Sequence, residues 1–382
     1  MLRIHYSLES DVQKTISDIT APAELNISMR NKILKIKKGK KLAAGELLAE
    51  RPSKYGAACS AALSGKATKV NYHHLTIKAD GGEESVEPID VKSMGPGKEL
   101  LRTLQELGLN IAALSSHADK LVINGLNPEP GISVAEQLLK DERKTIEAGL
   151  RLAEALITPV HTYLAVAAGA SYELAGTERV FVKPKYPNSL DALVVKKVTG
   201  KEFPDDTKVI SVMDLYNLGR VYETGMPITD TIMTIGEKNY RVLFGTPVSH
   251  ICNELGIDVK SGDKVVLDGP FRGEAVYSLD EGVKKGDYGL FVIPSGTFPS
   301  IEDATCINCG ECVLSCPARI QPNMLSRYAE YEMFEMAEKH NLHSCFECGL
   351  CSFNCTVRRP ILQYIRFAKD QLLVSGQAEK TS

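Results

Sequence analysis

The chain lacks any long hydrophobic run. Its most apolar stretch, TYLAVAAGA at residues 162–170, is far shorter than the roughly 20 residues that a membrane-spanning helix needs. The first residues, MLRIHYSLESDVQK, contain no apolar core of the kind found in secretory leaders. We therefore expect no transmembrane segment of its own and a cytosolic, reducing location.

An excess of positive charge is also missing. The chain has 45 basic and 48 acidic side chains, a formal net charge of −3, so no broad basic field attracts nucleic acid. It has no G-x-S-x-G sequence, no G-K-[ST] phosphate loop and no helix with paired metal-binding histidines. We therefore expect no nucleic-acid partner and predict no catalytic side chains.

Cysteine, by contrast, is concentrated in two short runs. CINCGECVLSCP spans residues 306–317 and CFECGLCSFNCT spans 345–356, and together they hold eight of the ten cysteines. Each run reads C-x2-C-x2-C-x3-C, which is the spacing of bacterial ferredoxins with [4Fe–4S] clusters. In a reducing compartment, clustered cysteines indicate metal rather than disulfides. Zinc, which uses pairs of C-x2-C arms, is the less favoured alternative.

The fourth cysteine of such a run ligates the other cluster in two-cluster ferredoxins. We therefore predict two [4Fe–4S] clusters with crossed ligation. The first is assigned to Cys306, Cys309, Cys312 and Cys355. The second is assigned to Cys345, Cys348, Cys351 and Cys316. Pro317 follows the first run, whereas Thr356 stands at the corresponding place in the second; we expect the cluster to persist there with altered local hydrogen bonds.

The residues around the cysteine runs favour helices. Between the runs, residues 317–344 have apolar side chains at spacings of three and four, which predicts a helical spacer. We expect a stripe on this spacer to pack over the clusters: Met324, Tyr328, Tyr331 and Phe334. Four basic residues follow the last cysteine, and they fit either docking of an acidic partner or a solvated helix face: Arg358, Arg359, Arg366 and Lys369. Cys59 and Cys252 stand alone and are expected to be buried apolar residues.

The rest of the chain changes pattern twice. Residues 27–80 alternate apolar and polar side chains around glycines, as half-buried strands do. Strands and helices alternate over residues 93–245, including an expected helix over 133–156, which favours a mostly parallel sheet. Residues 240–294 return to short strands. The sequence therefore predicts a multidomain α+β chain.

The layout resembles the C subunit of Rnf-type membrane electron-transport complexes. CINCGECVLSCPARIQPNMLSRYA, QYIRFAK and GTPVSHICNELGI carry the resemblance, which spans nearly the whole chain. It implies a barrel-sandwich hybrid domain (1–92), an α/β flavoprotein-like domain (93–239), an SLBB β-grasp module (240–295) and a helical ferredoxin domain (296–382). The α/β domain is also related to the flavin-bearing subunit of respiratory complex I.

In that family, NADH reduces FMN in the α/β domain and electrons pass through the clusters to membrane partners. The flavin lies on a loop of the form G-x-G-G-A-G-F-P-T, whose glycines allow close approach to the phosphate. This chain instead reads LGLNIAALSSHADKLVING. Its NGLNPEP and KYPNS segments keep only part of the family's nucleotide-site pattern. We expect a degenerate pocket whose remnants are Asn124, Glu129 and Lys185, and FMN and NADH chemistry to be lost rather than kept.

The resemblance implies an iron–sulfur electron-transfer subunit of an Rnf-like redox complex. Its partners would be other subunits of a membrane complex or a soluble electron-transfer protein, at the cytoplasmic face of the membrane. Three alternatives stay open. They are an NADH-oxidising flavoprotein that retains FMN, a quinone-linked module, and a scaffold subunit that the clusters only stabilise.

Overall fold

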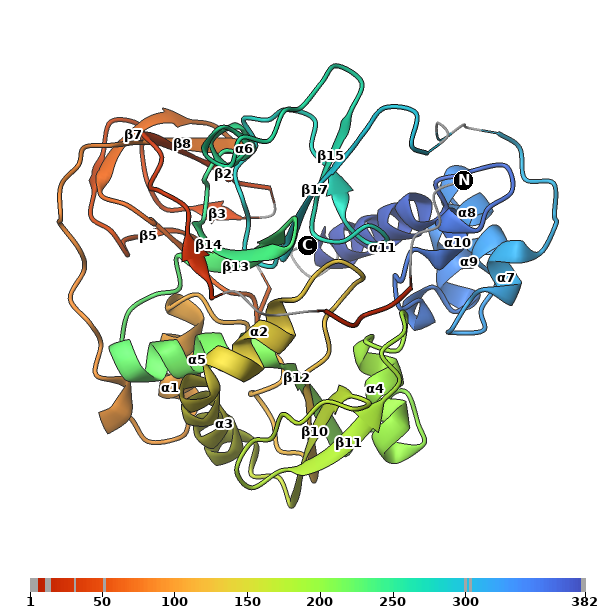
Figure 1. Cartoon of the computed structure of the whole chain (residues 1–382), viewed down its shortest axis with the longest axis horizontal. Coiled ribbons are helices and arrows are strands. Elements are labelled where there is room, and N and C mark those ends of the chain that lie inside the picture. Colours follow the sequence, from red (N-terminus) through yellow and green to blue (C-terminus); the bar gives the residue numbers. More distant parts are fainter. Residues whose placement is uncertain are drawn as a thin grey trace. The chain divides into compact units, whose positions relative to one another are not determined.

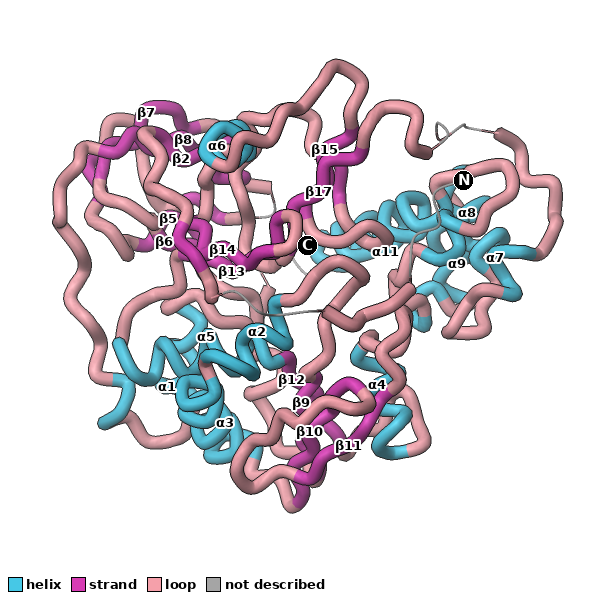
Figure 2. The backbone as a smooth tube through the Cα atoms, viewed as in Figure 1, coloured by secondary structure: helices cyan, strands magenta, loops and turns pink. Residues whose placement is uncertain are grey.

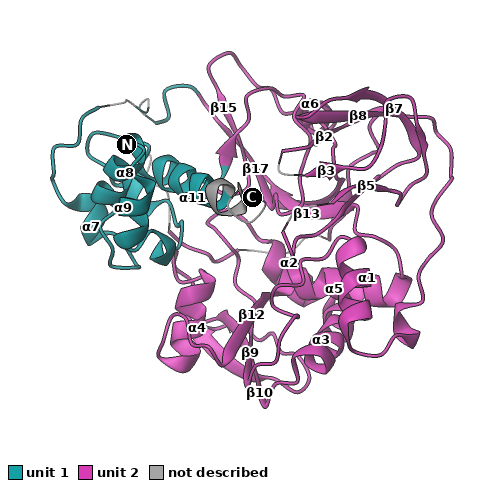
Figure 3. Ribbon diagram, turned by 180° about the vertical axis from the view of Figure 1, so that it is seen from behind, with its two compact units in different colours: residues 1–3, 270–273, 295–382 teal, residues 4–269, 274–294 magenta. Residues whose placement is uncertain are grey.

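The computed structural model describes residues 6–10, 15–30, 32–50, 53–298, 301 and 304–378, with side chains as far as Leu373. It divides into two compact units (Figure 3). One unit contains residues 270–273 and the chain from Ser295 onward, and the other contains the remaining described residues.

The larger unit begins with two small antiparallel sheets. The four-stranded sheet has the order β2 (Glu24–Ser28), β8 (His74–Ala79), β7 (Gly65–Val70) and β4 (Lys41–Leu42). The three-stranded sheet contains β3 (Ile33–Leu34), β5 (Leu47–Glu50) and β6 (Cys59–Ser60). Alternate residues such as Leu25 and Ile27, or Leu75 and Ile77, are buried in a common core with Leu42 and Leu48, as the alternating pattern predicts.

A parallel sheet follows, with helices on both faces (Figure 1). Its strand order is β11 (Glu178–Val182), β10 (His161–Ala167), β9 (Lys120–Asn124) and β12 (Thr207–Ser211). The helices are α1 (Lys98–Glu106), α2 (Val134–Asp141), α3 (Arg143–Ile157), α4 (Asp191–Thr199) and α5 (Val212–Thr224), with a 3-10 turn, η1, at Val91–Ser93. The single helix expected over 133–156 is two helices that meet at Glu142.

Neighbouring residues of β9 enter different cores because strand side chains alternate between the two faces of a sheet. Leu121 and Ile123 join the core that includes residues of α3 and α5. Val122 packs in a separate core with Val194 and Val195 of α4. On the first face, Gly149 of α3 and Gly219 of α5 allow the two helices to touch, since a Cβ at either glycine would lie within 2.0 Å of a backbone oxygen.

The third part of this unit is a six-stranded mixed sheet. Its order is β1 (Ser17–Asp18), β14 (Lys238–Leu243), β13 (Asp230–Ile235), β17 (Gly289–Ile293), β15 (Lys264–Leu267) and β16 (Glu274–Ala275). Helix α6 (Val248–Glu254) carries Cys252, which is buried as expected, whereas Cys59 is half-buried. The boundary expected between residues 239 and 240 falls inside β14, and the sheet already includes β13.

The smaller unit is helical, as Figure 2 shows by colour. It contains α7 (Glu311–Leu314), α8 (Pro322–Glu330), α9 (Phe334–Lys339), η2 (Leu342–Ser344), α10 (Leu350–Phe353) and α11 (Ile361–Ala378). Leu325, Ala337, Leu342 and Ile365 form its core together with the buried Cys312 and Cys351. Among the described helices of the whole chain, none is long and apolar enough to cross a membrane.

Candidate cluster sites

The two cysteine runs fold into nearly identical loops. In each run, two residues between the first and third cysteines adopt positive φ: Asn308 and Gly310 in the first, Glu347 and Gly349 in the second. This conformation turns backbone N–H groups toward sulfur. The amide of Asn308 lies 3.5 Å from Cys306 Sγ, and the amide of Glu347 lies 3.4 Å from Cys345 Sγ. The common spacing therefore produces a common cradle.

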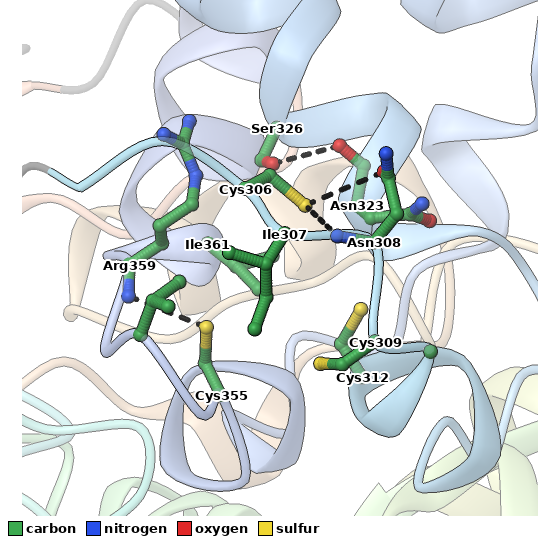
Figure 4. A pocket seen from close by; sticks show the side chains of 12 residues that line it. Cys306, Ile307, Asn308, Cys309, Cys312, Asn323, Ser326, Cys355, Arg359 and Ile361 are labelled. Atoms are coloured by element: carbon green, nitrogen blue, oxygen red, sulfur yellow. Dashed lines mark hydrogen bonds between the residues drawn. The ribbon is translucent and has the colours of Figure 1, made fainter.

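One cavity brings thiols of both runs together. Its walls include Cys306, Cys309 and Cys312 from the first run and Cys355 from the second (Figure 4). Cys355 Sγ also accepts a hydrogen bond of 3.4 Å from the backbone N–H of Arg359. These four cysteines are the set assigned to the first cluster from the sequence.

The other four thiols also form a group. Burial, together with the neighbouring Cys345 and Cys316, raises the pKa of Cys348 to about 11. Burial likewise raises the pKa of Cys351, with added repulsion from Cys345, Cys348 and Cys316. Each of these thiols is thus close enough to its neighbours to oppose their ionisation. Cys316, from the first run, is thus among the groups that oppose the ionisation of three thiols of the second run.

Both groups fit a four-iron cluster by their donor chemistry. Each offers four sulfur atoms, and backbone N–H groups point toward several of them, which is the environment that such clusters use. Four thiolates packed together repel one another, so they need a cationic core to remain ionised. Within the residues described, no three His, Cys, Asp or Glu side chains are arranged to hold a single metal ion. In a four-iron cluster each thiolate binds a different iron, which requires a wider arrangement.

The two groups differ in exposure. Cys309 is exposed, and its Sγ lies 3.4 Å from the hydroxyl oxygen of Thr356. Hydrogen bonding, first from Thr356 and then from the amide of Glu311, holds the pKa of the Cys309 thiol below its usual value. In the second group, Cys348 and Cys351 are only 8% and 7% exposed. The first set therefore contains one exposed thiol, whereas the second set contains none.

Three of the basic residues after the last cysteine are already paired. Arg359 is 3% exposed, and its guanidinium donates to Glu330 at 2.6 Å and to the backbone oxygen of Ala304 at 2.8 Å. Arg366 and Lys369 bind the carboxylate of Glu347 at 3.1 and 2.7 Å. The expectation of a solvated or docking surface was therefore wrong for Arg359, which is a buried cation beside the first cavity.

The spacer is helical, and two of the four residues of its predicted stripe pack as expected. Residues Tyr328 and Phe334 pack against the core of the helical unit. Tyr331, at the end of α8, is 71% exposed, because α8 ends there and α9 begins a new direction after Met333. The expectation that Tyr331 packs over the clusters was wrong, since it assumed one continuous helix.

The glycines at matching places in the two loops provide a first test. Both have left-handed backbones, with φ of 82° at Gly310 and 76° at Gly349. A Cβ at Gly310 meets open space, whereas a Cβ at Gly349 would lie 2.1 Å from the backbone oxygen of Phe271. We expect Gly310→Ala to cost about 1–2 kcal/mol of unfolding free energy from strain alone, and Gly349→Ala to cost clearly more. Thermal unfolding and iron content of the two variants check this, and equal losses would contradict it.

The three residues expected to remain from a nucleotide pocket lie at or just beyond the carboxyl ends of the parallel strands. Asn124, at the end of β9, donates to the backbone oxygen of Ser189 and to the carboxylate of Asp191 at 2.8 and 2.7 Å. Glu129 is 1% exposed. Lys185 is exposed, with its ammonium 5.9 Å from the ring centre of Tyr6. The side chain of Asn124 is therefore held by neighbouring residues of the protein.

Residues 6–10 lie along the same edge of the sheet. The amide of Leu8 donates to the backbone oxygen of Pro184 at 3.0 Å, and the amide of Tyr186 donates to Tyr6 at 2.7 Å. The side chain of Asn127 donates to the backbone oxygen of Leu8 at 3.2 Å. Nothing in the sequence indicated this placement, because the short polar segment has no periodic pattern.

Eight thiols, held by two matching loops whose backbone N–H groups point at sulfur, define an iron–sulfur protein. Residues 298–356 match the family model described as "4Fe-4S dicluster domain". The chain is 25% identical to the C subunit of the proton-translocating ferredoxin:NAD(+) oxidoreductase complex of Clostridium ljungdahlii, over 90% of this chain and 86% of that one. It is 23% identical to the C subunit of the Na(+)-translocating ferredoxin:NAD(+) oxidoreductase complex of Acetobacterium woodii, over 88% and 87%. The chain is thus similar, over nearly its whole length, to the C subunits of two such oxidoreductase complexes.

Other relatives are longer. The C subunit of the ion-translocating oxidoreductase complex of Citrobacter koseri is 26% identical, and the match covers 72% of this chain but 42% of that protein. Among solved structures, NAD+-reducing [NiFe]-hydrogenase in the H2-reduced state is 13% identical with a TM-score of 0.42, covering 66% of this chain and 57% of that one. A likeness of this size is too weak to define the fold or the activity.

Proposed function

We propose that this protein is the iron–sulfur electron-transfer subunit of an Rnf-type redox complex. The observation that carries the proposal is the cavity in which Cys355 of the second run joins Cys306, Cys309 and Cys312 of the first. This arrangement supports crossed ligation of two [4Fe–4S] clusters. When bound, such clusters accept and release single electrons. The chain holds their thiolates, directs backbone N–H groups at the sulfur atoms and buries part of the second set.

Crossed ligation of the two clusters favours electron transfer between them. Because Cys312 and Cys316 are one helical turn apart and belong to different sets, the two sets must be close neighbours. Cys351 and Cys355 impose the same closeness from the other run. A zinc or scaffold role would not need two thiol sets joined in this way.

We propose that the α/β domain carries no flavin. The glycine-rich loop is missing from the sequence. Asn124 is engaged by Ser189 and Asp191, and residues 6–10 run along the strand ends where ligands of parallel sheets bind. NADH oxidation would then take place on another subunit or another protein.

The partners in this proposal are the other subunits of a membrane complex, on its cytoplasmic face. The relatives' names describe the C subunits of translocating oxidoreductase complexes. Ile307 and Leu314, which flank the exposed Cys309 in the sequence, are 59% and 82% exposed. Apolar side chains beside an exposed thiol suit contact with a redox partner.

We also propose the finer domain assignment. The two antiparallel sheets around Leu25 and Leu75 suit the barrel-sandwich hybrid, and the parallel sheet with helices on both faces suits the flavoprotein-like domain. The mixed sheet with α6 suits the SLBB β-grasp module, with a start before residue 240. The domain limits of 92, 239 and 295 stay predictions.

One anaerobic titration tests the function. The purified protein is expected to be brown, to show no flavin absorption, and to bleach with dithionite but not with NADH. Bleaching by NADH, together with a flavin spectrum, would instead establish the flavoprotein alternative. Clusters that no reductant bleaches would favour a scaffold, and a colourless protein without iron would exclude the proposal.

A further inference from the structure

The two cysteine loops form an internal repeat, so each residue of one loop can be compared with the residue at the matching position of the other. The cysteines, the left-handed residues and the short helices occur in the same order in both. Arg319 and Arg358, which both have a left-handed backbone conformation, also occupy matching places after the fourth cysteine. Two chemical differences that follow the fourth cysteine fall next to the first thiol set. They are Thr356 in place of Pro317, and Arg359 in place of Ile320.

Thr356 follows Cys355 and reaches a different ligand of the same set. Its hydroxyl oxygen is 3.4 Å from Cys309 Sγ, a normal length for a hydrogen bond to sulfur. Pro317, the matching residue of the other run, has neither a hydroxyl nor an N–H group. The repeat therefore provides a side-chain donor to the first thiol set at a place where the second set has none.

Arg359 adds a buried charge to the same site. It lines the cavity of the first set, and its backbone N–H donates to Cys355 Sγ at 3.4 Å. Its side chain is 3% exposed, and the buried Nε has no hydrogen-bond partner among the described residues. The matching Ile320 is apolar and 8% exposed. Glu330 offsets part of the charge, but it is 28% exposed and does not line the cavity.

The second set has a different environment. Lys369 donates to the backbone oxygen of Cys345 at 3.1 Å, and Lys369 and Arg366 both bind the carboxylate of Glu347. These side chains are 18%, 29% and 32% exposed, so water screens them more than it screens Arg359. Cys348 and Cys351 are nearly buried, and burial opposes the extra negative charge that an added electron brings.

We infer that Thr356 and Arg359 set the reduction potential of the first cluster above that of the second. The inference rests on the proposed function. An added electron makes a site more negative, so a hydrogen-bond donor at Cys309 and the buried cation of Arg359, which lines the first cavity, stabilise the reduced form. An electron moving from the second site to the first oxidises one and reduces the other by one electron. The first site, with its exposed thiol at Cys309, is then the place where electrons leave for a partner.

The test is a redox titration of the full-length holoprotein followed by electron paramagnetic resonance. Thr356→Val keeps the size of the side chain. It is expected to lower the reduction potential of the first cluster, so that the ratio of reduced to oxidised cluster at a fixed applied potential falls severalfold. Arg359→Met is expected to lower that ratio about tenfold, which corresponds to a fall in reduction potential of roughly 59 mV for one electron. Arg359→Lys keeps the positive charge and is expected to retain most of the potential of the unmodified protein. Because Thr356 is exposed, its replacement leaves the core intact even if Arg359→Met impairs folding.

The repeat offers the matched control. Thr356→Ser retains the donor and is expected to leave the first potential unchanged, and Ile320→Val is expected to leave both unchanged. The inference is overturned if Thr356→Val shifts neither potential, if it shifts the second instead, or if the second cluster has the higher potential in the unmodified protein. Iron content separates the two proposals: a protein without clusters defeats the proposed function, whereas clusters with unshifted potentials defeat this inference alone.

Discussion

Replacing Cys355 by alanine is expected to remove the cluster whose other three ligands lie in the first cysteine run. Cys355 lines one cavity with Cys306, Cys309 and Cys312, so its loss leaves that set with three thiols. Cys316→Ala is expected to remove the other cluster, because Cys316 faces Cys345, Cys348 and Cys351. Each variant should retain about half of the iron and one of two paramagnetic signals.

Pairs of substitutions make this result decisive. With crossed ligation, Cys306→Ala combined with Cys355→Ala removes no more iron than either change alone, because both act on one cluster. Cys316→Ala combined with Cys355→Ala removes all of it. Uncrossed ligation predicts instead that Cys306→Ala combined with Cys355→Ala removes all of the iron. It also predicts that Cys345→Ala combined with Cys355→Ala removes no more iron than either change alone. Cys252→Ala, at a buried thiol in the other unit, controls for general effects of losing a cysteine.

Neutralising Glu330 is the second change with a large expected effect. Arg359 is almost completely buried, and Glu330, at 2.6 Å, is its carboxylate partner. Glu330→Gln leaves the guanidinium without a countercharge, and breaking such a pair costs about 3–5 kcal/mol when both groups are buried. Since Glu330 is partly exposed, we expect a loss at the lower end, about 3 kcal/mol of unfolding free energy, measured by urea unfolding of the holoprotein.

The control for this prediction lies on the neighbouring helix. Glu335, in the first turn of α9, is exposed, and Glu335→Gln is expected to change stability by less than about 0.5 kcal/mol. The double variant Glu330→Gln with Arg359→Met removes both charges and is expected to be more stable than Glu330→Gln alone. A Glu330→Gln variant as stable as the Glu335→Gln variant would show that water compensates Arg359.

The parts of the structure that the sequence predicted are those governed by local periodicity. The strands expected over residues 27–80 and the alternating strands and helices expected over residues 93–245 are present in the structure. The grouping of Cys355 with the first run agrees with the ferredoxin spacing, because that spacing leaves the fourth cysteine facing away from its own loop. Periodicity could not show the break at Glu142, where two amphipathic helices with a similar pattern meet.

The missed features depend on contacts between distant residues. Arg359 stands in a basic run that reads as solvated, and its burial depends on Glu330 and Ala304. In the sequence, Thr356 differs from the first run only by replacing a proline, and no pattern shows that it contacts Cys309. Residues 6–10 carry no pattern that would place them beside Pro184 and Tyr186. Comparing the two runs position by position would have singled out Thr356 and Arg359.

The crossing of the thiol sets also has a consequence for biosynthesis. A chain emerges from the ribosome with its N-terminal part first. The first run can be fully translated and folded while its fourth ligand, Cys355, is not yet made, and the second set waits for Cys345, Cys348 and Cys351 in the same way. Neither cluster can be completed until almost the entire chain has been translated. With crossed ligation, a chain that stops between the two runs is therefore left without a complete ligand set.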